Sequence, residues 1–187
     1  MEMQYAGFWR RLGAHLLDIA ILLPLGVVGS YGFRHYRLFP VYYFAPCLMI
    51  NLFYLVFLVR RFGGTPGKVI AGLQIVKTDG GKIGYREALL RCAVEFFLYF
   101  LGLVALGIAA TSVSDHDYLA QIPSKRTAFL REASPEWHKF ISWAQTAWVW
   151  GEFVVLLTNQ KRRALHDFLA GTVVTIKKQP IQVTGGD

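Results

Sequence analysis

The sequence predicts an all-α membrane protein with four transmembrane helices and a small cytoplasmic β-hairpin element. Of its 187 residues, 54% are hydrophobic and only 17% are charged, whereas soluble domains carry about 25% charged residues. A helix crosses a bilayer with roughly 20 mostly apolar residues, and four stretches are that long. They cover about residues 12–33, 38–59, 92–113 and 137–158. We expect residues 1–187 to form a single membrane domain.

The first apolar stretch is expected to stay in the mature protein. It carries Asp18 in its middle and lacks the small-residue cleavage site of a secretory signal. The second stretch contains no charge, and it begins near Pro40 with the aromatic residues 42–44, which favour the membrane interface. A short outer hairpin is therefore predicted between these two helices.

The segment between the second and third stretches predicts a sharp turn followed by β structure. Residues 63–67 read Gly-Gly-Thr-Pro-Gly, which breaks regular structure. Residues 73–78 then predict a strand, 79–81 a turn, and 82–84 a short return arm. Residues 172–176 are a second β-branched run, which we expect to meet these pieces at the inner membrane face.

The segment between the third and fourth stretches, residues 114–139, contains four acidic and four basic side chains. It is long enough for a small outer cap or for a helix that lies on the surface. We therefore expect added structure on the outer side, opposite the β element.

The basic residues predict the orientation. Fourteen lysines and arginines lie on one side of the four stretches and six on the other. The positive-inside rule then places both termini in the cytoplasm of a multi-pass protein of the cell inner membrane. The formal net charge of +8 is explained by this topology and by anionic lipid at the cytoplasmic face, so we expect no nucleic-acid partner. The larger group comprises Arg10, Arg11, Arg60, Arg61, Lys68, Lys77, Lys82, Arg86, Arg91, Lys161, Arg162, Arg163, Lys177 and Lys178, and the smaller comprises Arg34, Arg37, Lys125, Arg126, Arg131 and Lys139.

Ionisable residues within the apolar stretches are the candidates for function, because burying charge in hydrocarbon is costly. Arg11, His15 and Asp18 occupy positions i, i+4 and i+7 of the first stretch, and helical spacing predicts one polar stripe. Asp18 lies about two turns deeper than Arg11 and needs a partner. Two roles stay open for it, a hydrogen-bonded group that orients helix packing or an ion or proton site.

A second stripe is predicted in the third helix. Glu87, Arg91, Glu95 and Tyr99 follow each other at steps of four, so Arg91 is expected to pair with Glu87 or Glu95. If Arg91 takes Glu87, Glu95 is free for Arg11, for His15 or for a transported cation. Outside the membrane, Asp167 has two open roles, capping a turn or pairing with a cytoplasmic arginine.

Enzyme motifs are not found. GGTPGKV resembles a phosphate loop, but Phe62 and Val69 stand where the Walker motif needs Gly and Ser or Thr. There is no H-E-x-x-H, paired C-x-x-C or G-x-S-x-G. Cys47 and Cys92 fall in or beside apolar stretches and are interpreted as small buried residues. We therefore expect a protein that is not an enzyme and has no cofactor or metal.

Three segments resemble the RDD family of bacterial integral membrane proteins, named for one arginine and two aspartates. They are YAGFWRRLGAHLLDIAILL at 5–23, GGTPGKVIAGLQIVKTDGGKIGYREALLR at 63–91 and RRALHDFLAGTVVTI at 162–176. The resemblance implies that the name-giving residues are Arg11, Asp18 and Asp167, with Arg10 as the alternative for the first. For this family a transport-related role is commonly suggested, and cation/proton antiport has been attributed to some members.

Two functions follow as hypotheses. In the first, Asp18 and Glu95 exchange protons for a monovalent cation, His15 titrates beside them, and Arg11 and Arg91 tune their pKa values. Because four helices form a small pathway, we expect a homo-oligomer or a membrane protein partner in that case. In the second, the chain is a non-catalytic assembly or accessory subunit of a membrane complex. A membrane enzyme that acts on lipid is the least supported reading.

Overall fold

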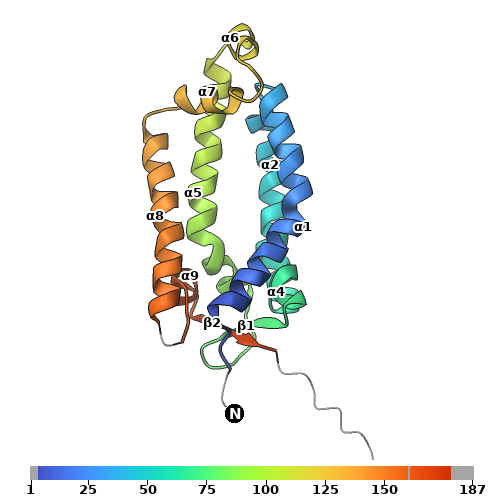
Figure 1. Cartoon of the computed structure of the whole chain (residues 1–187), viewed down its shortest axis with the longest axis vertical. Coiled ribbons are helices and arrows are strands. Elements are labelled where there is room, and N and C mark those ends of the chain that lie inside the picture. Colours follow the sequence, from blue (N-terminus) through green and yellow to red (C-terminus); the bar gives the residue numbers. More distant parts are fainter. Residues whose placement is uncertain (1–3, 160, 178–187) are drawn as a thin grey trace, which may run out of the picture.

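The computed structural model describes residues 4–159 and 161–177, so Lys178, counted above among the cytoplasmic cations, lies outside the described residues. Four helical segments are long and apolar enough to cross a membrane, Phe8–His35, Phe39–Ile70, Tyr85–Ser112 and Trp137–Thr158. Figure 1 shows them side by side as an elongated bundle. The prediction of four membrane helices is confirmed.

The second membrane segment is composed of several elements. It runs through α2 (Phe39–Leu52), the π-helical turn η1 (Phe53–Phe57) and α3 (Leu58–Phe62), and it ends with the short helix α4 (Pro66–Ile70). Gly63 terminates α3 with a left-handed backbone, φ 78°, which glycine adopts without a steric penalty. The chain therefore turns sharply at the predicted breakers. The other three segments are single helices, α1 (Phe8–His35), α5 (Tyr85–Ser112) and α8 (Trp137–Thr158).

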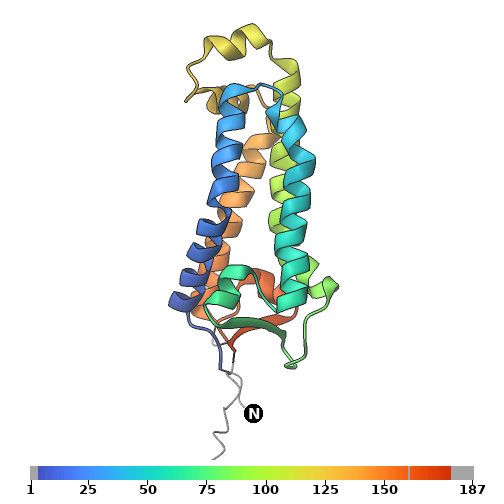
Figure 2. The ribbon, with the colours of Figure 1, turned by 90° about the vertical axis from the view of Figure 1, so that its right-hand side faces the viewer.

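A two-stranded antiparallel sheet lies at the end of the bundle that carries the N-terminus (Figures 1 and 2). Strand β1 (Leu73–Lys77) pairs with β2 (Thr172–Ile176), which confirms that these distant pieces meet. The predicted return arm contributes one bridge, Val76 to Lys82, and the N-terminal segment adds another, Tyr5 to Thr175. The sheet, α4 and the short helix α9 (Leu165–Leu169) together form what we call the base.

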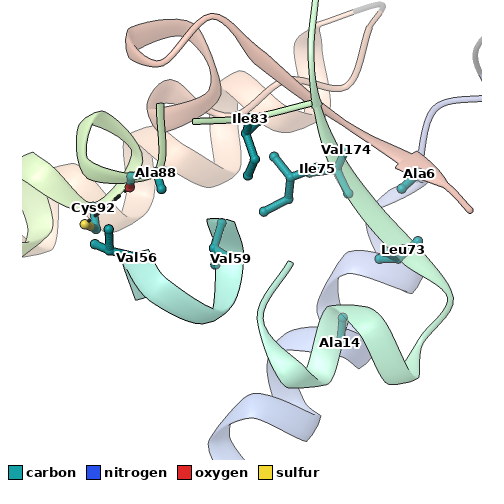
Figure 3. Packing of buried hydrophobic residues seen from close by; sticks show 10 residues of the cluster. All are labelled: Ala6, Ala14, Val56, Val59, Leu73, Ile75, Ile83, Ala88, Cys92 and Val174. Carbon is teal, nitrogen blue, oxygen red and sulfur yellow. Dashed lines mark hydrogen bonds between the residues drawn. The ribbon is translucent and has the colours of Figure 1, made fainter. Parts of the chain in front are cut away.

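The base has a packed apolar core. Side chains from α1, α3, the sheet and the start of α5 converge there (Figure 3). The core therefore joins residues that lie near the two ends of the described chain, from Ala6 to Val174. Its buried members are Ala6, Ala14, Val56, Val59, Leu73, Ile75, Ile83, Ala88, Cys92 and Val174.

The opposite end is closed by two short helices, α6 (Asp115–Ala120) and α7 (Arg126–Glu132). The Tyr118 hydroxyl donates to the Phe33 carbonyl at 2.7 Å, and Arg126 Nη1 donates to the Arg34 carbonyl at 2.9 Å. These donors satisfy carbonyls at the end of α1 that have no helical partner. Residues 114–139 therefore form a cap at the end of the bundle opposite the base. A second buried cluster packs beneath it, formed by Ala109, Ala110, Tyr118 and Leu130.

Candidate functional site

Asp167 is the most connected ionisable side chain of the base. Its side chain is 0% exposed. Oδ2 accepts from Arg11 Nη1 at 2.8 Å and from its own helix at Ala164 N, 3.1 Å, while Oδ1 accepts from Arg91 Nη1 and from Thr172 Oγ1. One carboxylate thus joins α1, α5, α9 and β2, and it fills both roles left open for it, cap and arginine partner. We call Arg11, Arg91 and Asp167 the clamp.

The partner predicted for Arg91 was wrong. Arg91 donates to Asp167 and to Thr172 instead of pairing along its own helix with Glu87 or Glu95. Glu87 instead pairs with Lys77 at 3.2 Å and accepts from Gly84 N at 2.6 Å. Helical spacing identifies neighbours within one helix only, whereas α9 brings a fully buried acid to Arg91 from a distant part of the chain.

The clamp holds Asp167 ionised. Burial by itself disfavours a carboxylate and would raise its pKa, but the positive charges of Arg91, His166 and Arg11 outweigh burial and keep the pKa of Asp167 well below its ordinary value. Two arginines thereby share one acid. Because two guanidinium groups face one carboxylate, the clamp carries a net positive charge. Among the described residues, the buried Nε and Nη2 atoms of Arg11 have no hydrogen-bond partner.

Asp18 is buried, and three donors from the second membrane segment satisfy it. Tyr54 Oη donates to Oδ1 at 2.5 Å, Thr65 Oγ1 to Oδ2 at 2.6 Å and the Gly67 amide to Oδ1 at 2.7 Å. Since Thr65 and Gly67 lie at the start of α4, the carboxylate occupies the position of a helix N-cap and meets the positive end of the helix. Asp18 thus has the partner it was predicted to need.

The GGTPGKV segment therefore binds a carboxylate of its own chain. At Gly67 a Cβ would lie 2.3 Å from the Ala14 carbonyl oxygen and 2.7 Å from the Asp18 carboxylate, so no larger residue fits there. Tyr54 belongs to the π-helical turn η1, an irregularity that often marks functional positions. Sequence reasoning missed Tyr54, Thr65 and Gly67 as partners of Asp18. The available signal was Thr-Pro-Gly, a typical start of a short helix.

His15 does not join this arrangement. It is exposed and makes no hydrogen bond or ion pair with any residue that the structure describes. The buried stripe of α1 runs through Arg11, Ala14 and Asp18, and His15 follows Ala14 by one residue, a rotation of about 100°. Its predicted place on the polar stripe was wrong for that reason.

A cavity of about 450 Å³ lies in the middle of the bundle, between the apolar clusters of the two ends. All four membrane segments line it. We call it the chamber. Its polar wall contains Tyr43, Asn51, Tyr54, Glu95, Tyr99 and Gln145, and the remaining wall is apolar or aromatic, including Leu22, Leu25, Phe96 and Trp148.

Glu95 is the one carboxylate among the residues that line the chamber. It lies about 15 Å along α5 from Tyr85, at 1.5 Å per residue. No residue in 4–159 or 161–177 forms a hydrogen bond or ion pair with its side chain. Asp18 does not line the chamber, so the two acids that were predicted to exchange protons together lie in separate sites. Tyr54 connects the two sites, because its hydroxyl reaches Asp18 while its side chain lines the chamber.

The chamber wall formed by α8 is the least packed. None of the residues of α8 is buried. At the base, His166 Nδ1 lies 2.8 Å from Glu152 Oε2, and the His166 amide donates to Glu152 Oε1 at 2.9 Å. This contact ties the end of α8 to α9, next to the clamp.

Metal ligands do not cluster in the described part of the chain. No group of three or more His, Cys, Asp or Glu side chains is placed there to hold an ion. Cys47 and Cys92 are buried free thiols, as interpreted from the sequence. The candidate site therefore contains Glu95, a carboxylate without a partner among the described residues, and two carboxylates that are held by hydrogen bonds, Asp18 and Asp167.

The comparisons with known proteins give a family and one relative. The family model of the RDD family matches residues 5–171, nearly the whole chain. The chain is 27% identical over 175 residues to the uncharacterized protein YckC of Bacillus subtilis (strain 168), covering 91% of this chain and 83% of that protein. No solved structure matches. With its four membrane helices, the chain is an integral membrane protein that belongs to the RDD family.

Proposed function

We propose that the protein is transport-related and exchanges a cation for protons, with the chamber as the binding space and Glu95 as the group that binds. One observation carries the proposal. Glu95 lines a cavity among all four membrane segments and has no partner in the described chain. An ionisable residue within a membrane is costly unless it is paired or functional. The clamp and Asp18 are paired, whereas Glu95 has no partner in residues 4–159 and 161–177.

The exchange follows from the charge of one carboxylate. Ionised Glu95, whose side chain is exposed on the chamber wall, attracts a cation into the chamber, and a proton that binds Glu95 removes that attraction. Asp18 and Asp167 act as positioning residues in this scheme, since their hydrogen bonds fix α4 and α9 to α1. We propose no bond-making step and no enzyme activity. A second copy or another membrane protein would complete the pathway.

The proposal includes an orientation. Most of the basic residues lie in or beside the base, in the sequence segments that flank it. We therefore place the base and both chain ends on the cytoplasmic side of the inner membrane, with α6 and α7 outside. Lys161 and Arg162, which are exposed, are then available to anionic lipid headgroups, whereas the Arg163 guanidinium donates to the Thr172 and Asp167 carbonyls of the base.

A flux assay tests the proposal. The purified full chain is reconstituted into liposomes with an internal pH-sensitive dye, and a proton gradient is applied with different external cations. Parent protein should dissipate the gradient when a suitable cation is added, whereas Glu95→Gln should not. The matched control is Glu136→Gln, because Glu136 is highly exposed near the outer cap and pairs only with Lys139 among the described residues.

Asp18→Asn separates the two acids in the same assay. A flux that survives Asp18→Asn but is lost with Glu95→Gln assigns the exchange to the chamber. Parent protein that gives no signal above empty vesicles with any cation would overturn the transport role.

A second function, a non-catalytic accessory subunit, is favoured by another observation. Asp18 and Asp167 are each saturated by donors from other elements, as expected for charges that only hold helices together. In that case the parent and Glu95→Gln would be equally inactive in liposomes and equally stable, and both would co-purify with the same membrane protein.

A further inference from the structure

The chamber is large for an inorganic ion. Its volume of about 450 Å³ lies within the range of about 300–1,000 Å³ that is typical of pockets for drug-sized molecules. A bare monovalent cation needs several oxygen ligands close together, but here the polar groups are spread among apolar side chains. The size and lining therefore match an organic molecule better than a dehydrated metal ion.

The lining has a distinct charge and shape. Glu95 supplies a single negative charge, and no Lys, Arg or His is among the described residues that line the chamber. Five aromatic side chains share the space, Tyr43, Tyr54, Phe96, Tyr99 and Trp148. The faces of aromatic rings attract organic cations, most strongly where water is excluded.

We propose that the chamber binds an amphipathic organic cation, an amine or quaternary onium ion that carries aromatic or alkyl groups. Its charge pairs with Glu95, and its apolar groups contact the aromatic rings and Leu22 and Leu25 of α1. The inference rests on the proposed function and defines its substrate class. An acyl chain would fill the apolar wall but would leave the carboxylate unpaired, and an anion would be repelled by it.

The polar side chains beside Glu95 add hydrogen-bonding groups. Asn51 donates to the Cys47 carbonyl at 2.8 Å, which leaves its amide oxygen as an acceptor for an ammonium group. Gln145 offers a similar acceptor from α8. An amine could therefore use both the carboxylate and an amide oxygen, whereas a quaternary ion would use the carboxylate and the rings.

Binding of tetraphenylphosphonium to the full chain in a nonionic detergent tests the proposal. Equilibrium dialysis measures the affinity, and tetraphenylborate, which has nearly the same shape and the opposite charge, is the ligand control. We expect saturable binding of the cation and not of the anion. Glu95→Gln should weaken binding roughly tenfold or more, and Glu136→Gln should leave it unchanged.

A further readout guards against a variant that fails to fold. Trp148→Leu removes one aromatic face and should reduce affinity with Glu95 intact. Equal binding by the parent and Glu95→Gln, or equal binding of phosphonium and borate, would mean apolar partition only and would overturn the proposal.

The two proposals fail separately. Tetraphenylphosphonium binding that depends on Glu95, without flux in liposomes, would keep the ligand class and reject transport. Proton flux coupled to sodium or potassium, with no phosphonium binding, would keep transport and reject the organic cation.

Discussion

Arg11 and Asp167 lie 156 residues apart in the chain and are joined by a 2.8 Å charge-assisted hydrogen bond, in which the carboxylate is completely buried. Arg91 approaches the same carboxylate from a third element. Removing one partner of a buried ion pair is more damaging than replacing the whole pair, since it leaves charge without compensation. The clamp is therefore the first place to test how the base is held together.

Asp167→Asn should destabilise the protein by about 3–5 kcal/mol, because Arg11 and Arg91 would be left without an anion. Thermal unfolding of detergent-purified protein, followed by tryptophan fluorescence, measures the loss. Glu136→Gln, at an exposed pair, should change the unfolding midpoint little. Equal midpoints for Asp167→Asn and the parent would show that the clamp does not stabilise the fold.

Lowering the pH should remove the contribution of Asp167 to the free energy of unfolding. Its pKa is below the ordinary value in the folded protein, so the unfolded chain binds the proton more readily. The stabilisation is therefore fully present above about pH 4, the ordinary pKa of aspartate, and is lost as the pH falls through the lower folded value.

The stability gap between the parent and Asp167→Asn is the quantity to measure. It should stay constant between about pH 8 and pH 5 and shrink only below about pH 4. Unfolding midpoints of both proteins across this range provide the test. A gap that already closes near neutral pH would mean that another group controls it.

Gly67→Ala should disrupt the contact between α1 and α4. The added methyl group would meet a backbone oxygen of α1 at 2.3 Å, which cannot move aside as a flexible side chain can, and overpacking of this kind costs about 1–3 kcal/mol. Gly13→Ala is the matched control, because nothing lies within 4 Å of its Cβ position. Thermal midpoints should separate the two variants, and similar values would contradict the tight packing of this motif.

Tyr54→Phe should weaken the Asp18 site while leaving the ring in the chamber wall. Loss of the hydroxyl leaves Oδ1 of Asp18 with the Gly67 amide alone, at a cost of about 1–3 kcal/mol. Tyr42→Phe, at a residue with 72% exposure, should be neutral. If Tyr54→Phe keeps full stability but alters phosphonium binding, the hydroxyl serves the chamber more than Asp18.

The orientation can be tested by labelling. In a background with Cys47 and Cys92 replaced, His116→Cys and Asp79→Cys place single thiols at the outer cap and at the β-turn of the base. A membrane-impermeant maleimide should label intact cells at position 116 only, and should label both positions after the membrane is opened. Labelling at position 79 in intact cells would reverse the proposed topology.

The sequence predicted the local features of the fold well, and of the long-range contacts it predicted the meeting of the two β segments and, as one of two roles, an arginine partner for Asp167. Runs of apolar residues defined four membrane helices, since spanning length and hydrophobicity are local properties. The partners of Asp18 and Arg91 could not be derived in this way, because helical spacing gives the neighbours of a residue within its own helix. Asp18 and Tyr54 are brought together by helix packing, and Arg91 and Asp167 by the position of α9.

The chamber, too, could not be derived from spacing within a single helix. Glu95 was recognised from its position in an apolar stretch, but its surroundings come from all four membrane segments. Asn51 and Gln145 could not be identified as chamber residues from the sequence, because a single amide in a membrane helix belongs to no recognisable spacing pattern. Cavities form where side chains fail to fill the space between helices, and that depends on how the helices are arranged.

The shared carboxylate of the clamp also bears on how the chain is made. Ribosomes deliver Arg11 to the membrane long before they synthesise Asp167, so the first helix must enter the lipid while its counter-ion does not yet exist. The clamp can therefore form only after all four membrane helices have been synthesised. A nascent chain that stops short of α9 would keep every membrane crossing and still lack the carboxylate that pairs with Arg11.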